Sequence, residues 1–319
     1  MTDSNTPRHQ SADLLLMIRP ASFRMNEETA VNNAYQTAAE DGMDAVATAQ
    51  AEFDGLVQAL RDQGITVCVQ EDDPDADTPD ALFPNNWISF HSDGRVGLYP
   101  MFAVNRRRER REDVLMRLST DHGRLLEEIV DFTEFEEHDV FLEGTGSLIL
   151  DRLNRLAYAS LGPRTDEQAT HHFCEAFGYD LVPFTASQTA GDTTEPIYHT
   201  NVMLAIGSEW AVVCDEIIRD EDERHAVLQA LADSGRTVVR ITGEQVNGFA
   251  GNVLEVRNAR GEQFIAMSSA AHAAFTPQQR ETLSRFATLI HAPIPTIEKL
   301  GGGSVRCMLA EVFLPQAQD

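Results

Sequence analysis

A cysteine near the end of the chain stands where a nucleophile could be exposed. Cys307 follows residues 301–306, which read Gly-Gly-Gly-Ser-Val-Arg. Consecutive glycines let the backbone adopt positive φ and approach a ligand closely. The alternative is a flexible turn followed by an ordinary strand cysteine, whereas a phosphate-binding loop is disfavoured because no Gly-Lys-Ser/Thr follows. A thiolate held on such a loop can attack an electrophilic carbon.

Two further residues have the chemistry to assist this nucleophile. His199 opens a predicted strand and can take up and return protons near neutral pH. Glu143 is followed by Gly144 and Gly146, which leave space around its carboxylate. Glu143 could orient His199 and accept a charge-assisted hydrogen bond from a substrate N–H. Taken singly, a structural histidine and an exposed turn glutamate explain these residues as well, so the prediction depends on their meeting Cys307.

Charge and composition exclude several classes of function. The formal net charge of −26 disfavours nucleic acid and anionic membrane surfaces as partners. The apolar run at residues 14–18 is too short to span a membrane and lacks the layout of a signal peptide, so we expect a cytoplasmic protein. Cys68, Cys174 and Cys214 have no C-x-x-C spacing and are predicted to be small buried hydrophobes. No metal and no cofactor are expected, and the oligomeric state is left open.

The elements that position these residues repeat along the chain. A strand, a turn, a second strand, a helix and a third strand occur four times, starting at Phe83, Phe141, Tyr198 and Gly248. The predicted helices span Arg106–Glu128, Asp166–Gly178, Asp222–Ser234 and Pro277–Leu289, and the predicted third strands span Ile129–Phe135, Leu181–Phe184, Thr237–Ile241 and Ile294–Ile297.

A fifth unit is incomplete at the C-terminal end. It supplies a single strand from Ser304 and would be completed by a strand at Leu14–Arg19, a helix at Ala38–Gln63 and a strand at Ile65–Gln70. The fold class is therefore α/β, with one domain over residues 14–319 that follows a flexible tail at residues 1–13.

Polar residues recur at the predicted start of each unit's first strand. They are Asn85, Asn86, Glu143, His199, Asn201, Asn252 and Cys307. In a closed radial array such equivalent positions meet near the axis, so the repeat predicts one shared cavity. The alternative is an ordinary α/β protein whose elements alternate by chance.

Several of these segments resemble motifs of the penteins, the guanidine-modifying superfamily of arginine deiminases, amidinotransferases and dimethylargininases. Residues 301–307 resemble the glycine-rich segment before the pentein nucleophile. Residues 142–146 are similar to the Glu-Gly-Gly motif, residues 199–201 to His-x-Asp, and residues 83–86 to Phe-x-x-Asp. Residues 247–252 also resemble a pentein segment. The resemblance covers essentially the whole chain and implies a five-bladed α/β propeller of ββαβ units, closed by the N- and C-terminal strands, with an axial site.

The departures from these motifs concern the substrate. Asn86 and Asn201 stand where the resemblance implies aspartates that flank a guanidinium, and Asn85 is a further substrate-binding candidate beside them. A guanidinium has only N–H donors, whereas a ureido group also has a C=O acceptor that asparagine can bind. The resemblance further implies that Arg107 and Arg164 bind the α-carboxylate of an amino-acid substrate.

Within the superfamily the chain looks most like the citrulline-utilisation branch, because of residues 19–23 (Arg-Pro-Ala-Ser-Phe) and Asn26. This resemblance predicts a cysteine hydrolase that converts citrulline to ornithine, ammonia and carbon dioxide through a covalent intermediate on Cys307. An arginine-directed dihydrolase, deiminase or amidinotransferase is the main alternative. A non-catalytic pentein that binds the ribosome is disfavoured by the Cys–His pair and the acidic charge.

Overall fold

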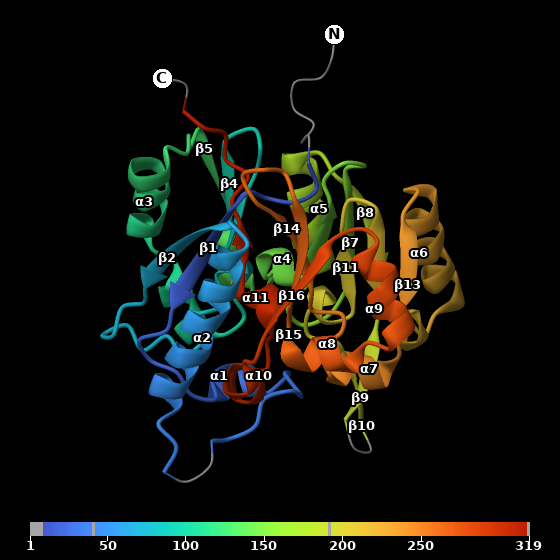
Figure 1. The fold of residues 1–319 in the computed structure, drawn as a ribbon, viewed down its shortest axis with the longest axis horizontal. Coiled ribbons are helices and arrows are strands. Elements are labelled where there is room, and N and C mark those ends of the chain that lie inside the picture. Colours follow the sequence, from blue (N-terminus) through green and yellow to red (C-terminus); the bar gives the residue numbers. More distant parts are fainter. Residues whose placement is uncertain (1–8, 40–41, 191–192, 318–319) are drawn as a thin grey trace.

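The computed structural model describes residues 9–39, 42–190 and 193–317 (Figure 1). Its strands form five three-stranded sheets and one two-stranded hairpin. In four of these sheets the first strand is antiparallel to the second, and the third is parallel to the second. Their strands are β3 (Ile88–Phe90), β4 (Arg95–Leu98), β5 (Glu128–Asp131); β6 (Leu148–Asp151), β7 (Leu156–Ser160), β8 (Asp180–Phe184); β11 (Leu204–Ile206), β12 (Trp210–Val213), β13 (Thr237–Arg240); and β14 (Leu254–Arg257), β15 (Gln263–Ser268), β16 (Thr288–Ala292).

The fifth sheet joins the two ends of the chain. β1 (Leu14–Arg19) pairs antiparallel with β17 (Ala310–Glu311) and parallel with β2 (Thr66–Glu71). The repeat is therefore present, and its fifth unit combines strands from both chain ends. The five sheets remain separate and no closed sheet forms among the described strands, so the five-bladed propeller stays a prediction. The third strand predicted at Ile294–Ile297 is wrong, because β16 ends at Ala292 and helix α10 (Pro295–Gly301) follows.

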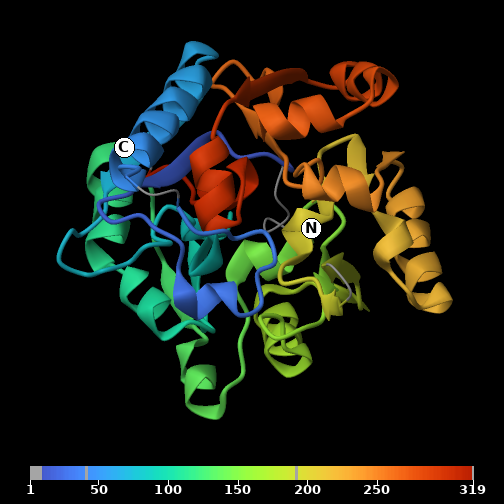
Figure 2. The same cartoon turned by 90° about the horizontal axis from the view of Figure 1, so that it is seen from below.

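Helices connect the parallel strands of each sheet, as a crossover between parallel strands requires. They are α3 (Glu112–His122), α5 (Glu167–Phe177), α6 (Glu221–Asp233), α8 (Ser269–Ala274) with α9 (Pro277–Ser284), and α2 (Ala45–Asp62). In the view from below these helices lie on the outside of the molecule (Figure 2).

Helix α5 illustrates why these segments are helical. Asp166 caps its N-terminus by accepting from the backbone N–H groups of residues 168 and 169. Ala169, Phe173 and Phe177 recur at helical spacing and are fully buried, so one face packs against the sheet. Gly178 ends the helix at φ 68°, a left-handed conformation that glycine adopts without strain.

A short helical turn precedes the first strand of four sheets. These turns are η1 (Pro84–Asn86), α4 (Gly144–Ser147), η4 (Thr200–Val202) and α11 (Val305–Met308). Cys307 therefore lies in a helical turn, and the strand predicted from Ser304 is wrong, since β17 begins at Ala310. His199 likewise immediately precedes η4 rather than opening a strand. One turn of helix directs side chains to several sides, which a pleated strand does not.

Shorter elements complete the described chain. They are α1 (Glu27–Ala30), α7 (Gly243–Asn247), the 3-10 turns η2 (Val104–Glu109), η3 (Thr133–His138) and η5 (Asp215–Ile217), and the hairpin β9 (Ser187–Ala190) and β10 (Thr193–Pro196). Among the helices of the described segments, none is both long and apolar enough to cross a membrane.

Part of the predicted tail at residues 1–13 is packed against the body of the protein. Gln10 is buried; its Nε2 donates to the Leu150 carbonyl over 2.7 Å, and its Oε1 accepts from the Arg152 N–H over 2.9 Å. Asp13 pairs with Arg124 over 2.9 Å. Residues 1–8 lie outside the described residues, so the prediction is untested for them.

Candidate active site

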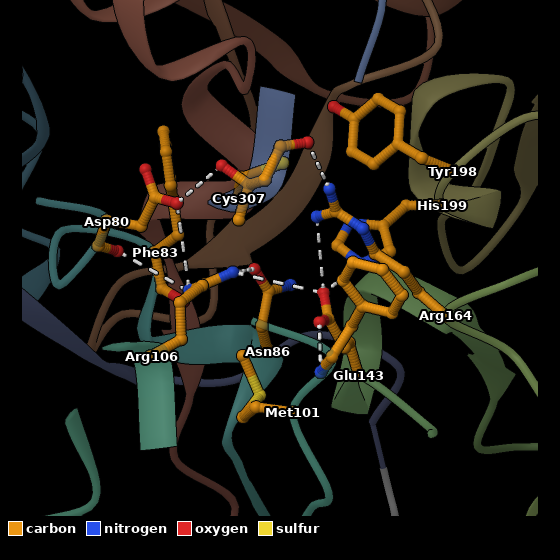
Figure 3. Close-up of polar contacts among 12 residues, drawn as sticks. Asp80, Phe83, Asn86, Met101, Arg106, Glu143, Arg164, Tyr198, His199 and Cys307 are labelled. Atoms are coloured by element: carbon orange, nitrogen blue, oxygen red, sulfur yellow. Dashed lines mark hydrogen bonds and ion pairs between the residues drawn. The ribbon is translucent and has the colours of Figure 1, made fainter. Parts of the chain in front are cut away.

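The segments that precede the first strands of different sheets bring several of the predicted reactive side chains to one cavity. Cys307, His199, Asn86 and Arg164 all line it. In Figure 3 Asn86 lies between Arg106 and Glu143, with Cys307 drawn above Asn86 and His199 drawn beside Glu143. The convergence predicted from the repeat is thus present for Cys307, His199 and Asn86.

Glu143 holds the imidazole of His199. Its Oε2 lies 2.7 Å from His199 Nε2, and its Oε1 accepts from the backbone N–H of Phe102 over 3.1 Å. The guanidiniums of Arg164 and Arg106 approach Oε2 to 3.5 and 3.9 Å. One fully buried carboxylate is therefore surrounded by an imidazole and two cations.

These surroundings set the protonation of the pair. Burial opposes ionisation of Glu143, but Arg164, His199 and Arg106 outweigh it and hold its pKa well below the usual value. Burial lowers the pKa of His199 to about 4, against the opposing effect of Glu143. The ring is then neutral at neutral pH, with its proton on Nε2 facing the carboxylate. Nδ1 is left as the proton acceptor of the ring.

The sulfur of Cys307 contacts two carboxamides. Sγ lies 3.2 Å from Asn252 Nδ2 and 3.4 Å from Asn201 Nδ2. Cys307 is buried, and so are both asparagines. Asn201, predicted to bind the substrate head group, is thus next to the predicted nucleophile, although it does not line the cavity.

Asn86 is held in one orientation. Its Oδ1 accepts from Arg106 Nη1 over 2.8 Å, while its Nδ2 is buried and has no hydrogen-bond partner among the described residues. Because arginine can only donate, the carbonyl end of Asn86 is fixed toward Arg106 and the NH2 end is free to donate. Asn85 is also buried, and its carboxamide has no hydrogen-bond partner among the described residues, but it does not line the cavity.

The arginine predicted from the run at residues 106–108 is displaced by one position. Arg107 donates to the Met101 carbonyl, pairs with Glu136 and lies away from the cavity. Arg106 is the buried cavity residue, and its Nε and Nη2 pair with both oxygens of Glu109 over 2.8 and 2.9 Å. Successive residues of a 3-10 turn point about 120° apart, so only one arginine of the run can face the site.

Arg164 lies at the cavity as predicted and is engaged by protein groups. Its Nη2 donates to the Thr29 carbonyl over 2.8 Å, and its Nε donates to Asn32 Oδ1 over 2.9 Å. The guanidinium is buried and lies 5.2 Å from the ring centroid of Tyr198. It connects the carboxylate of Glu143 to the segment around α1.

That segment covers the cavity and was not predicted as part of the site. Thr29, Asn33 and Gln36 line the cavity, and Gln36 Nε2 donates to the Gly301 carbonyl over 2.9 Å. The only sequence signal in this region was the resemblance at Asn26, whose side chain donates to Asp80 Oδ2 over 2.8 Å.

Asp80 is the second feature that the sequence did not indicate. It lines the cavity, is 2% exposed, and has an Oδ1 with no hydrogen-bond partner in the described chain. Its Oδ2 accepts from Asn26 and from Thr29 Oγ1 over 3.1 Å. A buried carboxylate oxygen without a partner is costly unless a ligand supplies a donor or a cation.

The remaining cysteines behave as predicted. Cys68, Cys174 and Cys214 are buried free thiols, and burial raises the pKa of Cys174 to about 11 and that of Cys214 to about 12. Within the described segments, no three His, Cys, Asp or Glu side chains are grouped so that they could hold a metal ion.

Solved structures of similar fold share little sequence with this chain. ArgZ, an arginine dihydrolase from the ornithine–ammonia cycle in cyanobacteria, superimposes with a TM-score of 0.73 at 16% identity over 96% of this chain and 41% of that chain. This chain therefore spans about two fifths of full-length ArgZ. The N-terminal domain of ArgZ, solved with a covalently bound reaction intermediate, gives 0.72 at 16% identity over 95% of this chain and 99% of that one.

A dimethylarginine dimethylaminohydrolase variant, solved as an adduct with S-methyl-L-thiocitrulline, gives a TM-score of 0.60 at 14% identity over 94% of this chain and 99% of that chain. Curated protein sequences contain no match to this chain.

The comparison with protein families is the more specific result. A family described as "N,N dimethylarginine dimethylhydrolase, eukaryotic" matches residues 19–314, which include every candidate site residue. This match, with the related folds, confirms the resemblance to the pentein superfamily, while the citrulline-utilisation branch stays a prediction. The chain belongs to the family described as "N,N dimethylarginine dimethylhydrolase, eukaryotic".

Proposed function

We propose that this member of a hydrolase family cleaves the ureido group of citrulline, with Cys307 as nucleophile. The observation that carries this proposal is the fixed orientation of Asn86, a cavity-lining residue whose buried NH2 group has no hydrogen-bond partner among the described residues. A ureido C=O accepts a hydrogen bond from that group. A guanidinium has no acceptor and would leave the NH2 unpaired, which costs free energy in a buried site.

The proposed reaction uses the tautomer of His199. The thiol proton of Cys307 passes to His199 Nδ1 as the sulfur bonds to the ureido carbon, and His199 then protonates the terminal nitrogen, which leaves as ammonia. A sulfur-bound N-alkylcarbamoyl group remains. Water activated by His199 adds to its carbon, the C–S bond breaks, and the released N-carboxyornithine decays to ornithine and carbon dioxide. Glu143 orients His199 and stabilises the imidazolium that forms transiently.

The other end of the substrate is proposed to meet Asp80. Its unpartnered Oδ1 suits the α-ammonium group of an amino acid. Arg164 is proposed to bind the α-carboxylate, for which one of its present contacts with Thr29 or Asn32 would have to exchange. We also propose that the five sheets form the blades of a propeller and that residues 14–319 are one cytoplasmic domain.

An arginine-directed dihydrolase is the second candidate. It is supported by the fold shared with ArgZ, since the superposition with the N-terminal domain of ArgZ covers 95% of this chain and 99% of that domain. Such an enzyme passes through a ureido compound after its first hydrolysis, so it would also use the donor of Asn86.

A product assay separates the two candidates. Purified protein is incubated with citrulline and, separately, with arginine, and ornithine and ammonia are quantified, with Cys307→Ala as the background control. The proposal predicts ornithine from citrulline. Ornithine from arginine but none from supplied citrulline would leave only the second candidate.

A further inference from the structure

The nucleophilic sulfur has a polar neighbour to which no function has been assigned. Asn252 lies in the turn just before β14 and is fully buried. Its Nδ2 lies 3.2 Å from Cys307 Sγ and 3.0 Å from the backbone carbonyl of Asn201. The three residues come from three different sheet units, so this contact exists only in the folded chain.

The carbonyl of Asn201 fixes the orientation of the Asn252 carboxamide. A backbone carbonyl can only accept, so the NH2 group must face it and the oxygen must face away. One amide proton then binds the carbonyl, and the second points at the sulfur. Consistent with this orientation, Asn252 Oδ1 has no hydrogen-bond partner among the described residues.

Asn201 contacts the same sulfur without this restriction. Its Nδ2 lies 3.4 Å from Sγ as a donor, and its Oδ1 lies 3.7 Å from Sγ as an acceptor of the thiol proton. Asn201 can therefore interact with either the thiol or the thiolate. Asn252 can only donate, and its hydrogen bond is stronger when the sulfur is charged.

The thiolate needs such a donor in addition to the buried guanidinium of Arg306, whose positive charge also attracts it. Cys307 is 3% exposed, so water solvates a charged sulfur poorly. The imidazole of His199, which lines the same cavity, is neutral at neutral pH, since burial lowers the pKa of His199 to about 4. A buried charge without hydrogen bonds is unfavourable. Among the described residues, the side-chain N–H donors at the sulfur are the carboxamides of Asn252 and Asn201.

We propose that Asn252 is a further catalytic residue, which stabilises the thiolate of Cys307 through a fixed N–H···S hydrogen bond. The proposal rests on the proposed function only in taking Cys307 as the nucleophile. The bond would act twice in each turnover, once when the thiol loses its proton and again when the C–S bond breaks and the sulfur leaves as thiolate.

The test measures alkylation of Cys307 by iodoacetamide as a function of pH, with mass spectrometry identifying the labelled residue. Asn252→Ala should lower the rate at neutral pH by about 10- to 100-fold, the loss expected for one hydrogen bond to a charged group. At high pH, where the thiolate forms in both proteins, the two rates should converge. A merely structural role would not produce this pH dependence. Equal rates at neutral pH in a folded variant overturn the proposal.

Asn258→Ala is the matched control. Asn258 is a buried carboxamide just after β14, where it donates to the Gln63 carbonyl over 2.9 Å, remote from the cavity. Its variant should show the wild-type alkylation profile. Because alkylation needs no substrate, a failure here is distinct from a failure to find citrulline turnover.

A second measurement does not depend on any Asn252 variant. The side-chain NH2 resonances of Asn252 should shift between the wild-type protein and Cys307→Ser, while those of Asn258 stay in place. Unchanged Asn252 resonances overturn the proposal even if the Asn252 variants fail to fold.

Discussion

Replacing Asn86 by aspartate tests whether the substrate head group is a ureido group, because it changes only the atom proposed to bind the ureido oxygen, Asn86 Nδ2. Asn86 Oδ1 accepts from Arg106 Nη1 over 2.8 Å, and an aspartate would keep that contact and strengthen it by charge. The free Nδ2 would become a carboxylate oxygen. At the position where Asn86 is proposed to donate to the substrate C=O, the variant would place a carboxylate oxygen, which also accepts hydrogen bonds and would repel that C=O.

The size of the effect follows from this exchange. One hydrogen bond is lost and a buried polar pair is left unsatisfied, which costs about 1–3 kcal/mol. Since about 1.4 kcal/mol corresponds to a factor of ten, kcat/KM for citrulline should fall roughly 10- to 100-fold. The added carboxylate should at the same time improve binding of a guanidinium compound such as arginine.

The assay compares ornithine formation and competitive inhibition by arginine in the wild type, Asn86→Asp and Asn86→Ala. Asn86→Ala removes the donor without adding charge, so it should lose citrulline turnover without gaining affinity for arginine. An Asn86→Asp variant that keeps the wild-type ratio of citrulline to arginine affinity would refute the reasoning.

Three further predictions concern the reacting groups. Cys307→Ala should reduce turnover by at least about 10³-fold with an unchanged melting temperature, and activity near wild type would exclude a covalent intermediate on sulfur. His199 has a pKa lowered from 6.5 to about 4, so the folded protein binds fewer protons than the unfolded chain between these values. Its contribution to the free energy of unfolding should therefore fall as the pH drops through this window, by up to about 1 kcal/mol per pH unit, and urea titrations of His199→Gln should show a flatter dependence. Gly146→Ala would place a Cβ 2.9 Å from His199 Nδ1 and closer still to Asn86 Nδ2. The variant should therefore lose turnover while it remains folded. A fully active Gly146→Ala variant would show that this packing is not needed.

The repeat could be recognised from the sequence because its signals are local. Alternating apolar residues, turn residues and amphipathic helices are written into short segments, and helix α5 with its Asp166 cap and Gly178 terminus is one example. The same locality explains the misplaced elements. Residues 294–297 read equally well as strand or helix, and their packing as part of α10 decided between the two.

The sequence by itself determined which reactive residue types the chain carries: a cysteine that follows a run of three glycines, a histidine and a glutamate at equivalent places of the repeat, and asparagines at two positions where the pentein resemblance implies aspartates. Residue types and spacings fix these facts, whatever the fold does. The tertiary structure decided which neighbours reach them. Arg106 rather than Arg107 faces the cavity because of the turn of η2. Asp80 is held at the cavity by hydrogen bonds from Asn26 and Thr29, which lie more than fifty residues earlier in the chain. Contacts of that kind depend on side-chain direction and on packing between distant segments, and no local pattern in the sequence encodes either.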